Sequence, residues 1–130
     1  MGSKSSYAVE RAGRADMVDV DQAAALAGVT PTQLRRLAAL KRPRVIAVEH
    51  AALGLRFPRW QFDGPVWPVV QQLGAALQGN AIAMLAWLET PLGVFQGRTP
   101  RVALEQGEPA DRVLAIAVHC YVCHEDALQD

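Results

Sequence analysis

The chain has 130 residues, of which 51% are apolar and 20% are charged, a composition typical of one globular domain or of two very small ones that share a core. No apolar run approaches the roughly 20 residues that a membrane-spanning helix needs, and the first residues lack the apolar stretch of a secretory signal, so we expect a cytoplasmic protein. The formal net charge is zero, but residues 1–59 hold ten Lys/Arg and five Asp/Glu, whereas residues 60–130 hold three and eight, so the two halves carry +5 and −5.

The chain is expected to begin with a disordered tail or a tag over residues 1–17, before the first helix signal. Asp19 and Gln22 have the spacing of a capping box, in which each side chain bonds the backbone N–H of the other residue. They predict a helix over residues 20–27, and Gly28 is a typical residue for its end.

A second helix is predicted after a three-residue turn. Thr30 can cap it, Pro31 suits its first position because no N–H is needed there, and Gln33 again has capping-box spacing. Leu34 and Leu37 share the face that would be buried. Two helices joined by a short turn that contains glycine predict a helix-turn-helix.

The exposed face of this second helix and the chain that follows are basic. Seven Lys/Arg and a single acid lie between Arg35 and Arg59, a local excess that is typical of nucleic-acid-binding proteins. The second helix of a helix-turn-helix enters the major groove of DNA. The predicted DNA-binding residues are Thr32, Gln33, Arg35, Arg36, Lys41, Arg42 and Arg44. The alternative is a solvated basic face that contacts no DNA.

A β-hairpin and an aromatic segment are predicted next. One strand would hold Val45, Ile46 and Val48, residues 49–52 would connect the strands, and the second strand would hold Leu53, Leu55 and Phe57. The hairpin is either a basic wing over DNA or a plain connection between two helical layers. Residues 57–64, FPRWQFDG, place three aromatic side chains in six residues, and we interpret them as a hydrophobic plug between domains.

Four helices are predicted in the second half of the chain. The first carries an apolar stripe and ends at Gly79, and the second covers residues 81–88 with Asn80 as its cap. The third covers residues 101–106 after a Thr99-Pro100 cap and closes at Gly107. The last covers residues 110–122 and is apolar nearly all round, which predicts burial against a partner, a second copy or the core.

The last helix runs into HCYVCH, residues 119–124. The motif matches the c-type haem attachment pattern, but attachment of that kind requires export. Two Cys and two His suit zinc, but residues at these spacings on one helix cannot all face one ion. We expect reduced thiols without a cofactor. A small metal-binding protein remains the remote alternative, with the ligands His119, Cys120, Cys123 and His124.

Catalysis has no candidate residues in this chain. The acids are scattered singly, and no glycine-rich phosphate loop, HExxH motif or nucleophile elbow is present. We therefore expect a protein that binds other macromolecules and is not an enzyme.

The second half resembles the toxin-binding domain of Xre/MbcA/ParS-type antitoxins. The pattern consists of Trp87-Leu88, Pro91-Leu92, Gly97-Arg98-Thr99-Pro100, Ala103-Leu104, Gly107 and Arg112-Val113-Leu114. The FPRWQFDG segment is also similar to one that precedes this domain in many such proteins, so the resemblance covers residues 57–122. The DNA-binding part is shorter than a full Xre bundle, and the acidic tail HEDALQD is brief; in both respects the chain departs from the family.

The resemblance implies an antitoxin of a type II toxin–antitoxin system. Such a protein would block a RES-type, NAD-consuming toxin, form a homodimer and repress its own operon by binding operator DNA. The implied partner-binding residues are Trp87, Leu92, Phe95, Arg98, Thr99, Leu104, Gly107, Arg112, Val113 and Tyr121. The alternative is an orphan DNA-binding transcriptional regulator whose C-terminal domain only dimerises.

The sequence thus predicts a mainly α fold with one small β-hairpin. A helix-turn-helix and the hairpin would form a DNA-binding part over residues 18–64, and a helical toxin-binding or dimerisation domain would cover residues 65–130.

Overall fold

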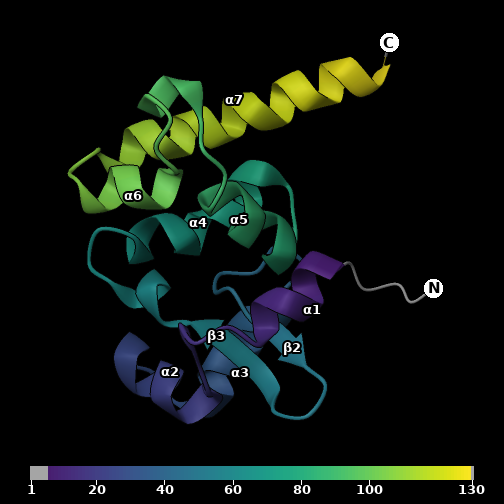
Figure 1. The fold of residues 1–130 in the computed structure, drawn as a ribbon, viewed down its shortest axis with the longest axis vertical. Helices are drawn as coiled ribbons and strands as arrows, with labels where there is room; N and C mark the ends of the chain where they lie inside the picture. Colours follow the sequence, from purple (N-terminus) through teal and green to yellow (C-terminus); the bar gives the residue numbers. More distant parts are fainter. Residues whose placement is uncertain (1–5, 130) are drawn as a thin grey trace.

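The computed structural model describes the backbone of residues 6–129 and the side chains of residues 9–120. Within this range the chain forms seven α-helices, two short 3-10 helices and three strands (Figure 1). Their bounds are α1 Ser6–Ala12, β1 Met17–Val18, α2 Val20–Ala27, α3 Pro31–Ala39, β2 Val48–His50, β3 Gly54–Pro58, η1 Arg59–Phe62, α4 Trp67–Leu77, α5 Ala81–Leu88, η2 Gly93–Phe95, α6 Pro100–Glu105 and α7 Ala110–Gln129. The predicted mainly α class is confirmed.

The sheet has one strand more than the predicted hairpin. β3 lies in the middle and pairs antiparallel with β2 on one side and with β1 on the other. Val45 and Ile46 lie outside β2, although both are fully buried, so the first strand was predicted too early. The connection is shorter than predicted and closes at Gly54, whose φ of 78° favours glycine.

The prediction of a disordered tail is wrong for residues 6–17, which form α1 and lead into β1. Ala12 and Met17 are buried in the core, and Arg11 is fully buried with them. β1 pairs Met17 with Pro58 and Val18 with Phe57. The segment is ordered because it completes the sheet and fills the core, two contacts made with distant parts of the chain.

Local capping forms α2 and α3 as predicted. The Asp19 carboxylate accepts the Gln22 N–H at 2.8 Å, and the Thr30 hydroxyl accepts the Gln33 N–H at 3.1 Å. In both helices the Gln side chain accepts the N–H of the cap residue in return. Gly28 ends α2 with a φ of 75°, and residues 28–30 connect it to α3. α2 and α3 pack against one another.

The buried side chains form two clusters. The smaller cluster joins α2, α3 and the sheet through Ala23, Ala24, Leu34, Val45 and Phe57. The larger cluster lies among α4, α5, α6 and α7, and Trp60 belongs to it. Next to Trp60 in the sequence, the buried Gln61 side chain accepts the N–H of Ile46 and donates to its C=O, both at 2.8 Å. The segment over residues 57–61 therefore connects the two clusters, in keeping with the predicted plug.

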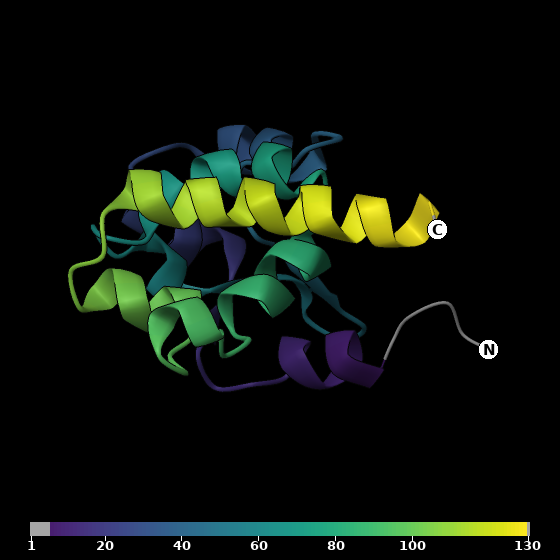
Figure 2. The same cartoon turned by 90° about the horizontal axis from the view of Figure 1, so that it is seen from above.

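The helices of the second half stack at the other end of the molecule from α2 and α3 (Figure 1). α7 lies across α4, and Val113 and Ala117 are fully buried on that side (Figure 2). α4 ends one residue earlier than predicted, because Gln78 adopts the left-handed conformation with a φ of 53°. Gly79 is needed instead for space: a Cβ there would lie 2.9 Å from the Ala83 Cβ.

Candidate functional site

The surface of α3 presents basic side chains to solvent. Arg35 and Arg36 on the helix and Lys41 just after it are exposed. In the part of the chain that the structure describes, none of the three forms a hydrogen bond or an ion pair. Thr32 is exposed beside them. Gln33 is also exposed, but its side-chain oxygen accepts the N–H of the cap residue Thr30. Free guanidinium and ammonium groups on one helix surface are suited to phosphate oxygens.

Two of the predicted DNA-binding residues bond α4 instead. The half-buried Arg42 donates from Nε and Nη2 to the Gln78 Oε1, at 3.2 and 2.9 Å. The exposed Arg44 donates from Nε to the Gln71 carbonyl at 3.4 Å. The chain after α3 turns back over α4, where the missing side chain of Gly74 gives it room. Arg42 thus also helps to hold the chain after α3 against the end of α4, and its DNA contact stays a prediction.

The hairpin does not present the expected basic wing. Arg56 is partly buried and donates to the Met17 carbonyl at 3.2 Å, which joins β3 to β1. At its turn, the His50 Nδ1 accepts the N–H groups of Ala52 and Leu53, both at 3.1 Å. These contacts favour the interpretation of the hairpin as a structural connection.

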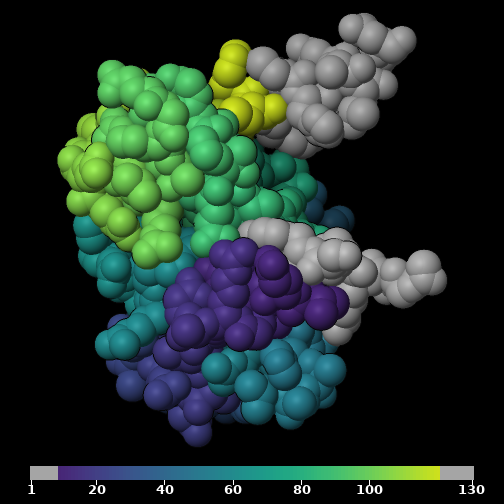
Figure 3. Space-filling view, viewed as in Figure 1, coloured from purple at the N-terminus to yellow at the C-terminus, as the bar shows by residue number. Residues whose placement is uncertain are grey.

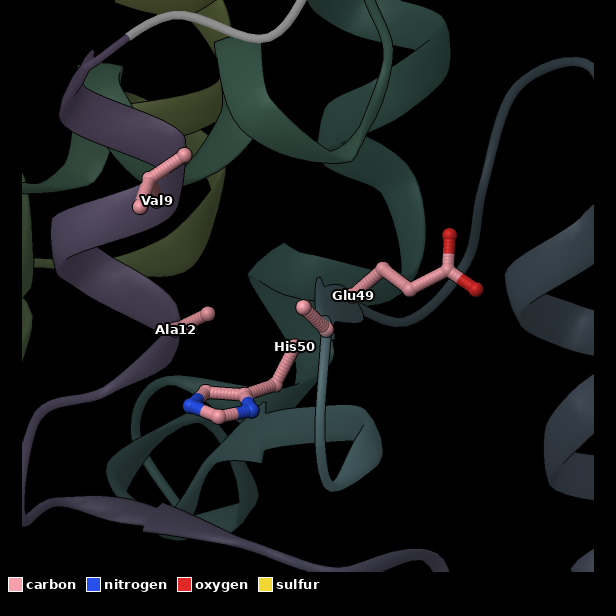
Figure 4. Close-up of a pocket in the computed structure, with 5 residues that line it drawn as sticks. Val9, Ala12, Glu49 and His50 are labelled. Atoms are coloured by element: carbon pink, nitrogen blue, oxygen red, sulfur yellow. The ribbon is translucent and has the colours of Figure 1, made fainter.

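A small hollow lies between α1 and β2 beside this histidine. It has a volume of about 140 Å³ and is lined by Val9, Ala12, Glu49, His50 and Ala51. Figure 4 shows that the Glu49 carboxylate points away from Val9 and Ala12. The His50 ring is already used by the turn, so the hollow brings together no groups for acid–base chemistry.

On the partner side of the molecule, the loop over residues 92–98 is held by its own backbone. The Leu92 carbonyl accepts the N–H groups of Phe95 and Gly97, and the Leu92 N–H bonds the Arg98 carbonyl at 3.1 Å. Gln96 and Gly97 both have positive φ values, 61° and 85°. The loop is therefore a compact turn with a defined shape.

Arg98 fastens this loop to the start of α7. Its Nε donates to the Phe95 carbonyl at 2.9 Å and its Nη1 to the Gln106 side chain at 2.8 Å. Its Nη2 lies 3.4 Å from Glu108, which also accepts from Arg112 at 2.6 Å. The hydrogen bond from Arg112 and the charges of both arginines outweigh partial desolvation, so the pKa of Glu108 lies below its usual value.

Three of the predicted partner-binding residues are core residues, and for them the prediction of a surface contact is wrong. Phe95 and Val113 are 0% exposed and Leu104 is 1% exposed. The Thr99 hydroxyl accepts the Val102 N–H at 3.1 Å and begins α6 at an angle that packs its apolar face inward. The motif thus contains core positions as well as surface positions, which spacing alone does not separate.

The other predicted partner-binding residues have mixed exposure. Trp87 and Leu92 are partly buried against the large cluster, and Arg98 and Thr99 are half-buried by the contacts described above. Gly107 and Arg112 are exposed, and the φ of Gly107 is 106°. Tyr121 lies outside the described side chains.

An apolar groove, here named the α7 groove, runs between the loop and α7. Its volume is about 400 Å³, and it is lined by Leu92, Gly93, Val94, Arg112, Ala115, Ile116, His119 and Cys120. Val94 is 48% exposed at its edge. An open apolar surface next to ordered walls is typical of a protein–protein contact site.

A buried ionic cluster escaped the sequence-based prediction. The Arg11 guanidinium donates to both oxygens of Asp16, at 2.5 and 2.6 Å, and to both oxygens of Glu89, at 2.9 and 3.0 Å. The Trp60 Nε1–H donates to Asp16 at 2.9 Å. Figure 3 shows the N-terminal segment, in purple, lying against both the green helical half and the teal hairpin. No local pattern signals this cluster, because Glu89 is 78 residues from Arg11.

The pKa values follow from this arrangement. Burial raises the pKa of Asp16, but the hydrogen bonds and charge of Arg11, together with the Trp60 N–H, outweigh it, and the net pKa is lowered. Burial likewise lowers the pKa of Arg11, and the two carboxylates more than reverse this. Both groups are therefore held in their charged forms.

A metal site finds no support in the described residues, which contain no group of three or more potential metal ligands. Of the four residues considered for such a site, the Cys123 and His124 side chains lie outside the described range, and Cys120 is a free, half-buried thiol. No helix within residues 6–129 combines the length and the apolar character needed to cross a membrane.

Comparison with protein-family models, with curated proteins and with solved structures finds no match to this chain.

Proposed function

We propose that this protein is the antitoxin of a type II toxin–antitoxin system, which binds operator DNA through α3 and blocks a RES-type toxin through the helices α5–α7. The observation that carries the proposal is that some residues of the antitoxin-like pattern form the core, while others hold the loop beside an open groove. Phe95 and Leu104 build the core, Arg98 and Thr99 hold the loop and start α6, and the α7 groove stays open beside them. A pattern that builds a rigid, open surface serves recognition of a protein.

The DNA-binding part of the proposal rests on α3. Arg35 and Arg36 are exposed on a capped helix that follows α2 after three residues. Each phosphate that such a side chain neutralises steepens the salt dependence of binding by about 0.9 in log–log slope. With Arg42 committed to Gln78, we expect a small contact that becomes specific when two copies act together.

The two proposed surfaces lie far apart in the molecule. α3 is at one end of the longest axis, and α6 and α7 are at the other (Figure 1). The toxin could therefore be bound without covering the face of α3. This separation supports a protein that binds DNA and a protein partner at the same time.

The test is co-expression with a RES-type toxin encoded beside this chain. We expect the chain to restore growth, to keep cellular NAD from falling and to co-purify with the toxin. A neighbour that is harmless and does not bind would contradict the antitoxin proposal and would leave the orphan regulator as the explanation of any DNA binding.

A matched pair of variants sharpens this test. Arg98→Ala removes the side chain that joins the loop to Gln106 and Glu108, so we expect weaker neutralisation with unchanged DNA binding. Arg101→Ala, on α6 just after this loop, removes an ion pair with Glu105 and a contact with the Trp60 ring, neither of which holds the loop, and should neutralise normally. Equal loss of neutralisation in both variants would remove the loop from the proposed toxin surface.

A further inference from the structure

The outer edge of β2 is open. β2 pairs with β3 on one side, and the strand order β1-β3-β2 leaves it at the edge of the sheet. Within the described chain, the backbone of Val48–His50 forms no hydrogen bond apart from this pairing. In an antiparallel pair, every second residue turns its N–H and C=O groups away from the partner strand. β2 therefore presents backbone groups that a further strand can bond.

The small apolar hollow described above lies between this strand and α1. Its lining consists of Val9 and Ala12 of α1 and of Glu49, His50 and Ala51 in and after β2. Val9 is 61% exposed, so the chain itself leaves much of this side chain uncovered. The volume of about 140 Å³ is close to that of a cavity of about 150 Å³ that binds benzene. The hollow thus has room for one aliphatic side chain.

Glu49 places an unpaired charge on the other face of the strand. Successive residues of a strand point to opposite faces, and Figure 4 shows the His50 ring on the side of Ala12 and the Glu49 carboxylate directed away from it. Glu49 is exposed and forms no hydrogen bond or ion pair with its side chain in the described part of the molecule. A carboxylate in this position favours a basic side chain on a strand added beside it.

We propose that β2 accepts an extended segment of a partner protein as an added strand, with one aliphatic side chain in the hollow and a lysine or arginine next to it in sequence. The alternation follows from strand geometry: if one residue of the segment faces α1, its neighbours face the side of Glu49. Backbone hydrogen bonds supply affinity in this mode of recognition, and the side chains select the sequence.

The edge is ordered before any segment binds. The His50 Nδ1 accepts the N–H groups of Ala52 and Leu53 and so fixes the turn that follows β2. Little conformational entropy is then lost on the side of this protein when a strand is added. The proposal does not rest on the antitoxin function, because the hollow shares no residue with the α7 groove or with the exposed cations of α3.

The test is a titration of the full-length chain with short synthetic peptides, followed by amide NMR spectra. The first peptide is Thr-Lys-Ile-Lys-Thr with blocked ends, and we expect saturable shifts at residues 48–51 and in α1, with a Kd below about 1 mM. Thr-Glu-Ile-Glu-Thr reverses the charges and should bind about fivefold more weakly. Thr-Lys-Ala-Lys-Thr lacks the aliphatic side chain and should bind about tenfold more weakly.

Variants of the protein test the two selecting residues. Glu49→Lys should reverse the preference between the lysine and glutamate peptides, whereas Asp63→Lys, an exposed acid outside the hollow, should keep it. Val9→Lys should weaken binding of the lysine peptide about tenfold, because it places a cation at the apolar lining. Leu26→Lys changes an exposed apolar residue of α2 and should leave the Kd unchanged. These side chains are all exposed, and thermal unfolding checks that each variant folds.

N-methylation of the peptide tests the backbone pairing. Successive N–H groups of a strand point to opposite edges, so only one of two peptides methylated at the isoleucine or at the following lysine should lose binding, by about tenfold. Equal binding of both would mean that no strand is added. The proposal is also overturned by an absence of saturable shifts up to about 5 mM peptide, or by equal affinity for the lysine, glutamate and alanine peptides.

Discussion

Replacement of the buried Arg11 should destabilise this protein more than any other single loss of charge that we describe. Arg11→Met keeps a long apolar side chain but removes the buried cation that bonds the carboxylates of both Asp16 and Glu89. Loss of one partner from a buried ion pair costs about 3–5 kcal/mol. Asp16 and Glu89 keep 35% and 21% side-chain exposure, so water reaches both, and we expect the lower end, about 3 kcal/mol.

For a chain of this size, a loss of about 3 kcal/mol corresponds to a fall in Tm of roughly 10 °C. Arg14→Met is the matched control, because Arg14 and its partner Glu10 are 51% and 67% exposed and an exposed pair contributes about 0.5 kcal/mol or less. Urea unfolding followed by circular dichroism measures both. Equal destabilisation of the two variants would refute the structural role given to Arg11.

The effect of Arg11 should also depend on pH. Because the pKa of Asp16 is lowered in the folded protein, its stabilising contribution is present above the unfolded pKa, about 3.9, and is lost as the pH falls through the folded value. The difference in stability between wild type and Arg11→Met should therefore be largest near neutral pH and shrink as the pH falls below about 4, through the lowered pKa of Asp16. A difference that is constant over this range would contradict the ionic explanation.

Two further substitutions test the packing that joins the two halves. Gly74→Ala should lower the free energy of unfolding by about 1–3 kcal/mol, because the added Cβ would lie 2.6 Å from the Pro43 carbonyl oxygen. The control is Gly93→Ala, whose Cβ would have no neighbour within 4 Å and which should unfold at nearly the wild-type urea concentration. Gln61→Leu should lower the free energy of unfolding by about 2–4 kcal/mol, because it removes the side chain that bonds the buried N–H and C=O of Ile46. A thermal midpoint equal to that of wild type would show that the backbone rearranges to satisfy these two groups.

The elements that the sequence predicted well are those set by local contacts. The two capping boxes at Asp19 and Thr30 each involve residues three apart, and both appear as predicted. The Asn80 side chain caps α5 by accepting the N–H of Ala83, also three residues away. Such signals depend on a few neighbouring residues, so the helix starts could be located without knowledge of the rest of the fold.

The elements that were missed depend on contacts across the chain. Residues 6–18 have no periodicity that marks them, and they are ordered because Arg11 meets Glu89 and β1 pairs with β3. The charge of Arg42 is visible in the sequence, but its hydrogen-bond partner Gln78, 36 residues away, could not be found from it. Charge and spacing predict the chemistry of a side chain, but they do not show which other part of the chain it meets.

The candidate partner surface was predicted only in part for the same reason. An apolar residue within a recognition pattern fits the core and the surface equally well, and Phe95 and Val113 proved to be core. The sequence placed Arg98 in the correct loop, but it did not show that Arg98 holds this loop to Gln106 and Glu108, which follow the next helix.

The most direct test of the central proposal separates the two surfaces in one molecule. Arg35→Ala combined with Arg36→Ala removes two exposed cations of α3 that have no other contact among the described residues. We predict that this double variant loses operator binding, with the salt-dependence slope of the residual binding reduced by about 2, and that it still protects cells from the toxin as well as wild type does. Loss of both activities together, or operator binding that persists unchanged, would contradict a protein that binds DNA through α3 and a toxin through its other end.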